Sequence, residues 1–263
     1  MGGEMEEIRG SVYDYPKYYD VLFASDWRAE YSFLSACFDK HAERPVWRLF
    51  EPACGTGRLL MRFARAGFEV SGNDLNAKAV DYCNKRLTRH GFPATAAVGD
   101  MCDFRVRRKQ DAAFNTINSF RHLDSEAKAR AHLECVAETL GKGGIYILGL
   151  HLTPTQGAAC DEETWSARRG KLSIDSRMWS IDVDRRRRRE LVAFTLDVTT
   201  PTRRFRLADE FPFRTYTAAQ FRRLLAAVPA LDLVETYDFA YDIDRSTRIC
   251  PRTEDVVYVL RKR

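Results

Sequence analysis

Residues 46–74 read VWRLFEPACGTGRLLMRFARAGFEVSGND and set the organisation of the whole chain. Their β-branched and aromatic start predicts a buried strand that ends at Glu51. A turn that carries Gly55 and Gly57 follows, and apolar residues at helical spacing then predict a helix. A second predicted strand ends near Asp74. Units built as strand, glycine-rich turn, helix and strand bind a nucleotide-like ligand at the carboxyl ends of their strands.

The residues around this turn indicate which ligand it accepts. A dinucleotide fingerprint needs a third glycine, and Leu60 stands at that position. The Glu51 carboxylate would repel a pyrophosphate at a cost of about a few kcal/mol in a low effective dielectric. It would attract a ligand that carries an ammonium and a sulfonium, and Asp74 could bind a ribose diol. S-adenosylmethionine has all of these groups and no phosphate.

The order acid-x-x-x-Gly-x-Gly, followed by a second acid, resembles the opening of the class I S-adenosylmethionine-dependent methyltransferases. The resemblance implies an α/β fold with a Rossmann-like, doubly wound sheet of seven strands, the last of them antiparallel. It implies S-adenosylmethionine as the cofactor, with Asp74 on the ribose, Asp100 on the adenine amine and Met101 over the ring. The full set of implied cofactor contacts is Tyr18, Glu51, Ala53, Gly55, Gly57, Asp74, Leu75, Asp100, Met101 and Asn115.

Alternating strand and helix patterns continue along the rest of the chain. Asn76 is a suitable N-cap for one of the helices, and Thr217 opens a capping box with Gln220. The glycine-rich residues 141–144 predict the end of a helix before the next strand. The predicted helices cover residues 77–90, 125–140 and 217–227, and the predicted strands cover 95–98, 111–117, 145–149, 231–239 and 256–260.

Residues 13–41 form an aromatic-rich leader that predicts two short helices at the entrance of the sheet. Core packing accounts for most of these aromatic side chains. Family members with a similar leader use it as a movable lid, so the resemblance implies that Tyr15, Tyr18 or Tyr19 covers the pocket. We take Tyr19 as a catalytic candidate on this basis.

The end of the fourth predicted strand lies where the family places its reacting centre. Members that modify nucleic-acid bases carry Asn/Asp-Pro-Pro-Tyr/Phe there, whereas this chain has Asn115-Thr116-Ile117-Asn118. The following NSFRHL segment looks more like small-molecule methyltransferases, including aminosugar N-methyltransferases. His122 is therefore the candidate base, because its unperturbed pKa suits proton transfer near neutral pH. The imidazole could instead bond a neighbouring backbone group, and both N- and O-methylation fit the sequence.

Residues 151–213 lack long helical periodicity and alternate like antiparallel strands, with a hairpin turn near residues 182–189. We expect this insert to cover the substrate. The predicted organisation is a methyltransferase core with a helical lid over residues 1–150, the insert over 151–213, and the end of the core over 214–263. The arginine run at residues 185–189 is bracketed by acids, which favours a solvated hairpin end over an RNA grip.

Composition sets the remaining expectations. The chain has 263 residues, 45% of them hydrophobic, and a net charge of +5. No apolar run approaches the roughly 20 residues of a membrane span, and no secretory signal is visible. Seven scattered cysteines fit reduced thiols in a cytoplasm and no metal site. We expect a monomer or homodimer that binds a small molecule, with nucleic acid an unlikely partner.

These observations predict an enzyme that transfers a methyl group from S-adenosylmethionine to a nitrogen or oxygen of a small molecule. Positioning and the exclusion of water would supply most of the rate. One alternative is a non-catalytic or RNA-directed module that keeps the fold and uses the arginine hairpin. The other is an NAD(P)-type oxidoreductase, which Leu60 and Glu51 disfavour.

Overall fold

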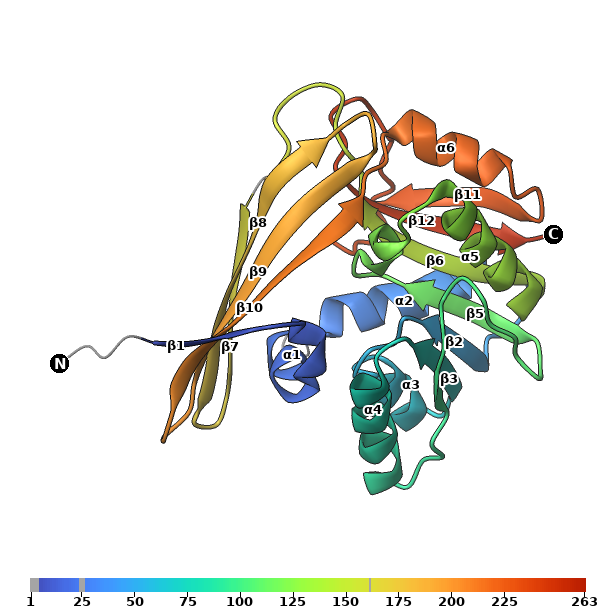
Figure 1. Ribbon diagram of the computed structural model, residues 1–263. Helices are drawn as coiled ribbons and strands as arrows, with labels where there is room; N and C mark the ends of the chain where they lie inside the picture. The colour runs from blue at the N-terminus through green and yellow to red at the C-terminus, as the bar shows by residue number, and fades with distance from the viewer. Residues whose placement is uncertain (1–4, 24–26, 161) are drawn as a thin grey trace.

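The computed structural model describes residues 5–23, 27–160 and 162–263, which form two separate β-sheets (Figure 1). The larger sheet has seven strands in the order β11-β12-β6-β5-β2-β3-β4. β12 runs antiparallel to both of its neighbours, whereas β6, β5, β2, β3 and β4 are mutually parallel. The strands are β2 (Arg48–Pro52), β3 (Glu69–Asp74), β4 (Ala96–Val98), β5 (Gln110–Asn115), β6 (Leu140–His151), β11 (Leu231–Tyr237) and β12 (Asp255–Lys262).

Helices cover both faces of this sheet. One core joins the sheet to α2 (Arg28–His41), α3 (Leu60–Arg65) and α4 (Ala77–Arg89) through side chains such as Phe38, Phe63 and Leu87. The opposite core joins it to α5 (Glu126–Thr139) and α6 (Ala218–Ala226) through Leu133 and Phe221. The predicted doubly wound α/β fold, with an antiparallel last strand, is therefore confirmed.

The sequence patterns located the helix ends well and one strand poorly. The Asn76 side chain accepts hydrogen bonds from the backbone of Lys78 and Ala79, and Thr217 with Gln220 forms the expected capping box. Helix α5 ends at Thr139, next to the predicted stop at residues 141–144, but the predicted start of the following strand at residue 145 was wrong, because β6 already begins at Leu140. At Gly144 an added Cβ would lie 2.7 Å from the Asp111 carbonyl, so this glycine permits the close approach of β5 and β6.

The second sheet has five strands in the order β1-β10-β9-β8-β7. Its hairpin turn at residues 185–188 lies inside the predicted turn region. Two edge strands were missed, because EEIR and EETWSARR are largely exposed and lack clear apolar alternation. The strands are β1 (Glu6–Arg9), β7 (Glu162–Arg169), β8 (Leu172–Asp184), β9 (Arg189–Thr199) and β10 (Arg204–Arg214), with β1 parallel to β10 and the others antiparallel.

The N-terminal leader packs on this second sheet. The short 3₁₀ helix η1 (Val12–Asp14) and helix α1 (Pro16–Phe23) share a buried core with Leu196, Val198 and Leu207 of the sheet. In Figure 1 α1 lies between the two sheets, beneath the long strands β8 to β10. The leader and the five-stranded sheet together therefore form one cover over the large sheet, and we call these two parts the cover.

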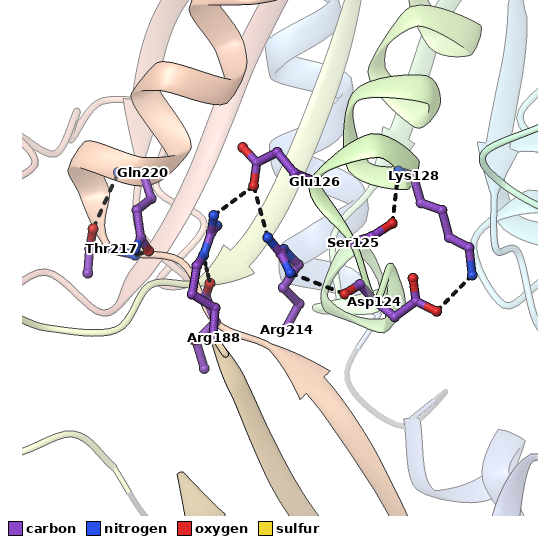
Figure 2. A network of polar contacts seen from close by, with 9 residues as sticks. Asp124, Ser125, Glu126, Lys128, Arg188, Arg214, Thr217 and Gln220 are labelled. Atoms are coloured by element: carbon purple, nitrogen blue, oxygen red, sulfur yellow. Dashed lines mark hydrogen bonds and ion pairs between the residues drawn. The ribbon is translucent and has the colours of Figure 1, made fainter. Parts of the chain in front are cut away.

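Two arginines connect the cover to the core (Figure 2). Arg188, from the β8–β9 turn, donates to the Glu126 carboxylate at 2.7 Å and to the Thr215 carbonyl at 3.2 Å. Arg214, at the end of β10, donates to the same Glu126 oxygen at 3.1 Å and to the Asp124 carbonyl at 3.1 Å. The arginine run thus contributes one anchor to the start of α5.

Candidate active site

A cavity of about 1020 Å³ lies between the carboxyl ends of the large sheet and the cover. The loops that follow β2, β3, β4 and β5 reach it from the core, together with His151 at the end of β6, as expected for a doubly wound sheet. The cover closes it with the aromatic side chains of Tyr13, Tyr19, Trp165, Phe194, Phe211 and Phe213. The site is therefore a polar crevice of the core beneath an apolar roof.

The glycine-rich turn after β2 forms one wall. Ala53 and Gly55 both line the cavity with positive φ values of 52°. A Cβ added to Gly55 would meet no atom within 4 Å, so this backbone is open to a ligand. Gly57 does not line the cavity. An added Cβ there would lie 2.3 Å from Cys83 Sγ, so this glycine serves the packing of the turn against α4.

Glu51 brings an unsatisfied carboxylate to this wall. The residue is buried, lines the cavity, and its Oε2 atom has no hydrogen-bond partner among the described residues. Burial raises the pKa of Glu51 well above its usual value, while the Arg58 guanidinium opposes the shift. Arg58 is itself paired with the Glu30 carboxylate at 2.5 Å, so its charge is already balanced. A cation entering the cavity would satisfy Glu51.

Asp74 stands at the end of β3 and closes the same wall. Its two carboxylate oxygens accept hydrogen bonds from the backbone of Gly55 and Asn76, each at 2.8 Å. Each oxygen retains a further lone pair, so Asp74 can still accept from a ligand hydroxyl. Burial raises its pKa. The next residue, Leu75, is 68% exposed and offers an apolar surface at the cavity edge.

Of the remaining predicted cofactor residues, the structure brings two to the cavity and leaves two outside its lining. Met101 and Asn115 line it, and the Asn115 Oδ1 atom is buried with no partner among the described residues. The Asp100 carboxylate accepts from the Cys102 backbone at 3.0 Å and lies outside the lining. Tyr18 also lies outside it, because its ring packs on Phe205 of β10.

His122 faces the cavity on the opposite side, beneath the roof. Its Nε2 atom lies 3.0 Å from the Tyr13 hydroxyl, and its ring packs on Phe213 and Phe211. The side chain is open to the cavity, yet these rings shield it from bulk water. This burial, with the adjacent Arg121 guanidinium, lowers the pKa of His122 to about 4. The imidazole is therefore neutral at physiological pH.

Tyr13 is a site residue that the sequence did not single out. The leader holds several tyrosines in a short stretch, and their spacing does not tell which of them faces inward. Tyr19 does line the cavity, with its ring centroid 5.4 Å from that of Tyr13. Burial raises the pKa of both phenols, so both stay protonated at neutral pH. A protonated Tyr13 hydroxyl can donate to the neutral His122.

A second histidine at the cavity was also missed. His151 ends β6 and pairs through Nδ1 with the Asp255 carboxylate at 3.0 Å, and both residues line the cavity with Glu163 of β7. The one signal in the sequence is the position of His151 directly after the fifth predicted strand.

The described residues were also compared with the requirements of a metal site and of a membrane-spanning helix. Among residues 5–23, 27–160 and 162–263, no group of three histidine, cysteine or acidic side chains is placed to hold a metal ion. In the same ranges no helix combines the length and apolar character needed to span a bilayer.

Comparison with known proteins supports the interpretation of the fold. The model of a family described as a methyltransferase domain matches residues 50–144. One curated relative is the dTDP-3-amino-3,4,6-trideoxy-alpha-D-glucopyranose N,N-dimethyltransferase of Streptomyces venezuelae, 28% identical over 138 residues. That alignment covers 51% of this chain and 56% of the relative. A putative methyltransferase of Geobacillus is 21% identical over 93% of this chain and 97% of its own length. The chain thus spans about half the length of the curated sugar methyltransferase.

Solved structures agree over nearly the whole chain. A S-adenosylmethionine-dependent methyltransferase from Clostridium acetobutylicum superposes with a TM-score of 0.75 at 16% identity, covering 94% of this chain and 97% of that one. DesVI from Streptomyces venezuelae superposes with a TM-score of 0.74 at 19% identity, covering 93% and 97%. The sugar N-methyltransferase KedS8 from Streptoalloteichus gives 0.72 at 17% identity, covering 100% and 98%. The predicted resemblance to methyltransferases is confirmed. The family model matches part of the core, and the fold superposes over nearly the whole chain, including the cover.

Proposed function

We propose that this protein transfers a methyl group from S-adenosylmethionine to the nitrogen of a small amino-sugar acceptor. The observation that carries the proposal is the unsatisfied, buried Glu51 carboxylate beside the open Gly55 backbone, in a cavity that also holds Asp74. Protein oxygen atoms that lack a hydrogen-bond donor suit a ligand that is cationic and rich in hydroxyl groups. S-adenosylmethionine is such a ligand, and when bound it would supply an electrophilic methyl group on a sulfonium.

The cofactor would occupy the wall of the core. Glu51 would receive its ammonium group, Asp74 its ribose, and Leu75 with Met101 the faces of its adenine. We propose that the backbone at Asp100, and not its carboxylate, contacts the cofactor, because the carboxylate already accepts a hydrogen bond from the Cys102 backbone. Tyr18 and Gly57 would support the site from outside, because neither lines the cavity.

The acceptor would lie between the core and the roof. Tyr13 and His122 form a hydrogen-bonded pair on one side of this space, and Tyr19 adds a protonated hydroxyl. The aromatic roof excludes water, which strengthens the polar contacts beneath it. An amino sugar fits this arrangement because it combines a nitrogen nucleophile with hydroxyl groups that can be held by these donors and acceptors. The relative from Streptomyces venezuelae is a sugar N,N-dimethyltransferase, which supports the same choice.

We further propose that the protein is cytoplasmic, that it is a monomer or homodimer, and that the insert begins after residue 150 and ends at residue 213. The arginine run gives no support to an RNA-directed module. Arg188 is bound to Glu126 and Arg187 lies beside Asp184, so part of its charge is neutralised within the protein.

Cofactor binding can be tested with a matched pair of variants. We expect calorimetry to show that S-adenosylmethionine binds the wild-type protein and that Asp74→Ala weakens the affinity at least about tenfold, because charged hydrogen bonds contribute roughly 1.5–3 kcal/mol each. The control is Asp81→Ala, an exposed aspartate of α4 that forms an ion pair with Lys85. Equal titration curves for wild type and Asp74→Ala, at equal melting temperatures, would remove Asp74 from the site.

A further inference from the structure

The carboxyl end of β6 and the first residue of the antiparallel strand β12 place an oriented histidine at the cavity. His151 and Asp255 are direct partners in the antiparallel register of these strands. The His151 Nδ1 atom lies 3.0 Å from Asp255 Oδ1, and its backbone N–H donates to Asn118 Oδ1 at 3.0 Å. The carboxylate selects the tautomer with the proton on Nδ1, so Nε2 keeps a free lone pair. Nε2 has no hydrogen-bond partner among the described residues.

A second carboxylate faces this pair from the cover. Glu163 lies on β7 and lines the same cavity. Its carboxylate has no hydrogen-bond or ion-pair partner in the part of the chain that the structure describes. Burial raises its pKa, and the nearest charges that act on it are those of His151, Asp255, Glu254 and Arg121. Acids outnumber cations here, so this end of the cavity attracts a cation.

The acceptor must arrive as a cation if it is an amine. An aliphatic amine is largely protonated at neutral pH, and its nitrogen has no lone pair until one proton leaves. His122 is poorly suited to accept that proton, because its pKa is about 4 and Arg121 is adjacent. The Tyr13 and Tyr19 phenols are already protonated. The reaction therefore needs a proton acceptor elsewhere in the cavity.

We propose that His151, oriented by Asp255 and opposed by Glu163, receives the ammonium group of the acceptor and takes its first proton. The inference rests on the proposed function and names the group that makes the nitrogen nucleophilic. The N–H bond breaks, its electron pair stays on the nitrogen, and the proton passes to His151 Nε2. The electron pair on the nitrogen then forms the bond to the methyl carbon, while the carbon–sulfur bond breaks and its electrons remain on sulfur.

Three features of the dyad suit this role. The developing imidazolium is stabilised by the Asp255 carboxylate at 3.0 Å. The His151 side chain is 20% exposed and that of Asp255 is 48% exposed, so the proton has a route to solvent between turnovers. The edge of the His151 ring also meets Phe239 at 90°, with centroids 5.1 Å apart, which fixes the plane of the imidazole.

Kinetics over a pH range separate this role from a structural one. The acceptor is whichever amino sugar the wild-type enzyme methylates, and the variants are His151→Asn, Asp255→Asn and Glu163→Gln. We expect His151→Asn to lower kcat/KM about 10²-fold or more at pH 6.5, the scale of a lost general base. The loss should shrink above pH 9, where the amine arrives neutral. Cofactor affinity should stay within about twofold. His90→Asn, an exposed histidine outside this cavity, is the matched control.

A second measurement needs no turnover and so distinguishes failure of this inference from failure of the proposed function. The imidazole signals of the five histidines are followed by NMR as D-glucosamine hydrochloride is added, with D-glucose as the neutral control. The signal that disappears in His151→Asn should shift with glucosamine and not with glucose, while the His90 signal stays fixed.

Two results would overturn the assignment. One is a loss of kcat/KM in His151→Asn that is absent or identical at pH 6.5 and pH 9. The other is a His151 signal that ignores glucosamine. If the wild-type protein methylates no amino sugar, the proposed function fails and the NMR result alone decides whether His151 binds an ammonium.

Discussion

Ala53, Asn118 and Tyr241 adopt positive φ values between 52° and 54° although none is glycine, and all three line the cavity. Each such residue costs of the order of 1–3 kcal/mol, which the surrounding structure must supply. The strain shapes the walls: Ala53 turns the chain into the loop after β2, and Asn118 presents its side chain to the backbone of His151. Three of the four such residues in the described part of the chain therefore lie at the proposed site, and the fourth, Arg188, lies in the β8–β9 turn.

The raised pKa of Glu51 leads to a testable prediction for the pH dependence of cofactor binding. Its pKa is raised without a ligand, so a fraction of the carboxyl groups carries a proton that an arriving cation must displace. We expect S-adenosylmethionine binding to release protons and to tighten as pH rises. Calorimetry in two buffers of different ionisation enthalpy measures the number released. Glu51→Gln should abolish the release and weaken binding at least about tenfold. Identical proton release in both proteins would show that Glu51 does not meet the cofactor's ammonium group.

His122 should affect rate without affecting its pH dependence. With a pKa of about 4 the imidazole is neutral throughout pH 6 to 9 and a weak base, so we assign it the role of orienting groups by hydrogen bonding. We expect His122→Ala to lower kcat about 10²-fold, by the same factor at pH 6 and at pH 9. Tyr13→Phe should reproduce part of this loss, because it lacks the hydroxyl that contacts His122. A loss confined to low pH would identify His122 as a proton acceptor, against this account.

At the scale of elements, the two sheets differ in how far the sequence predicts them. The parallel strands are buried on both faces and are bounded by helix caps, so they left strong patterns. The edge strands β1 and β7 belong to the cover and expose most of their side chains, so their sequences lack a clear apolar pattern. Likewise Tyr13 and His151 belong to the site because distant segments meet there; the local sequence does not distinguish Tyr13, and for His151 it offers only its position after a predicted strand.

The anchor of the cover is also an element-scale property. Arg188→Gln should lower the free energy of unfolding by about 1–2 kcal/mol, since a hydrogen-bonded ion pair is lost but the Glu126 side chain is 45% exposed and partly screened. Arg186→Gln is the control, because its exposed side chain lies two residues away in the same turn. Urea unfolding and amide exchange of β8 and β9 measure the difference. Equal stability of the two variants would mean that Arg188 does not hold the cover.

At the scale of the whole molecule, a buried histidine links the core to pH. His132 is fully buried on α5, within 2.7 Å of the Met101 carbonyl and 2.8 Å of the Tyr146 hydroxyl, and burial lowers its pKa from 6.5 to about 4. Between these values the unfolded chain binds more protons, so stability is complete above pH 6.5 and declines as pH falls toward 4. The decline from this residue is about 3 kcal/mol.

The contribution of His132 is measured by urea unfolding at pH 7.5 and pH 4.5. His132→Gln should be less stable at pH 7.5 yet lose less stability on acidification than the wild type. His90→Gln, which changes an exposed histidine, should keep the wild-type pH dependence. An unchanged difference between the two pH values in His132→Gln would contradict the assignment.

The central claim is methyl transfer to an amine, and mass spectrometry of an acceptor reaction tests it most directly. The protein is incubated with S-adenosylmethionine carrying a deuterated methyl group and with matched nucleotide-linked sugars that bear an amino or a hydroxyl group at the same carbon. The account predicts labelled methyl groups on the nitrogen of the amino sugar, and none on the hydroxyl sugar. Labelled methyl groups on oxygen alone, or no labelled product from any amino sugar while the cofactor is bound, would contradict it.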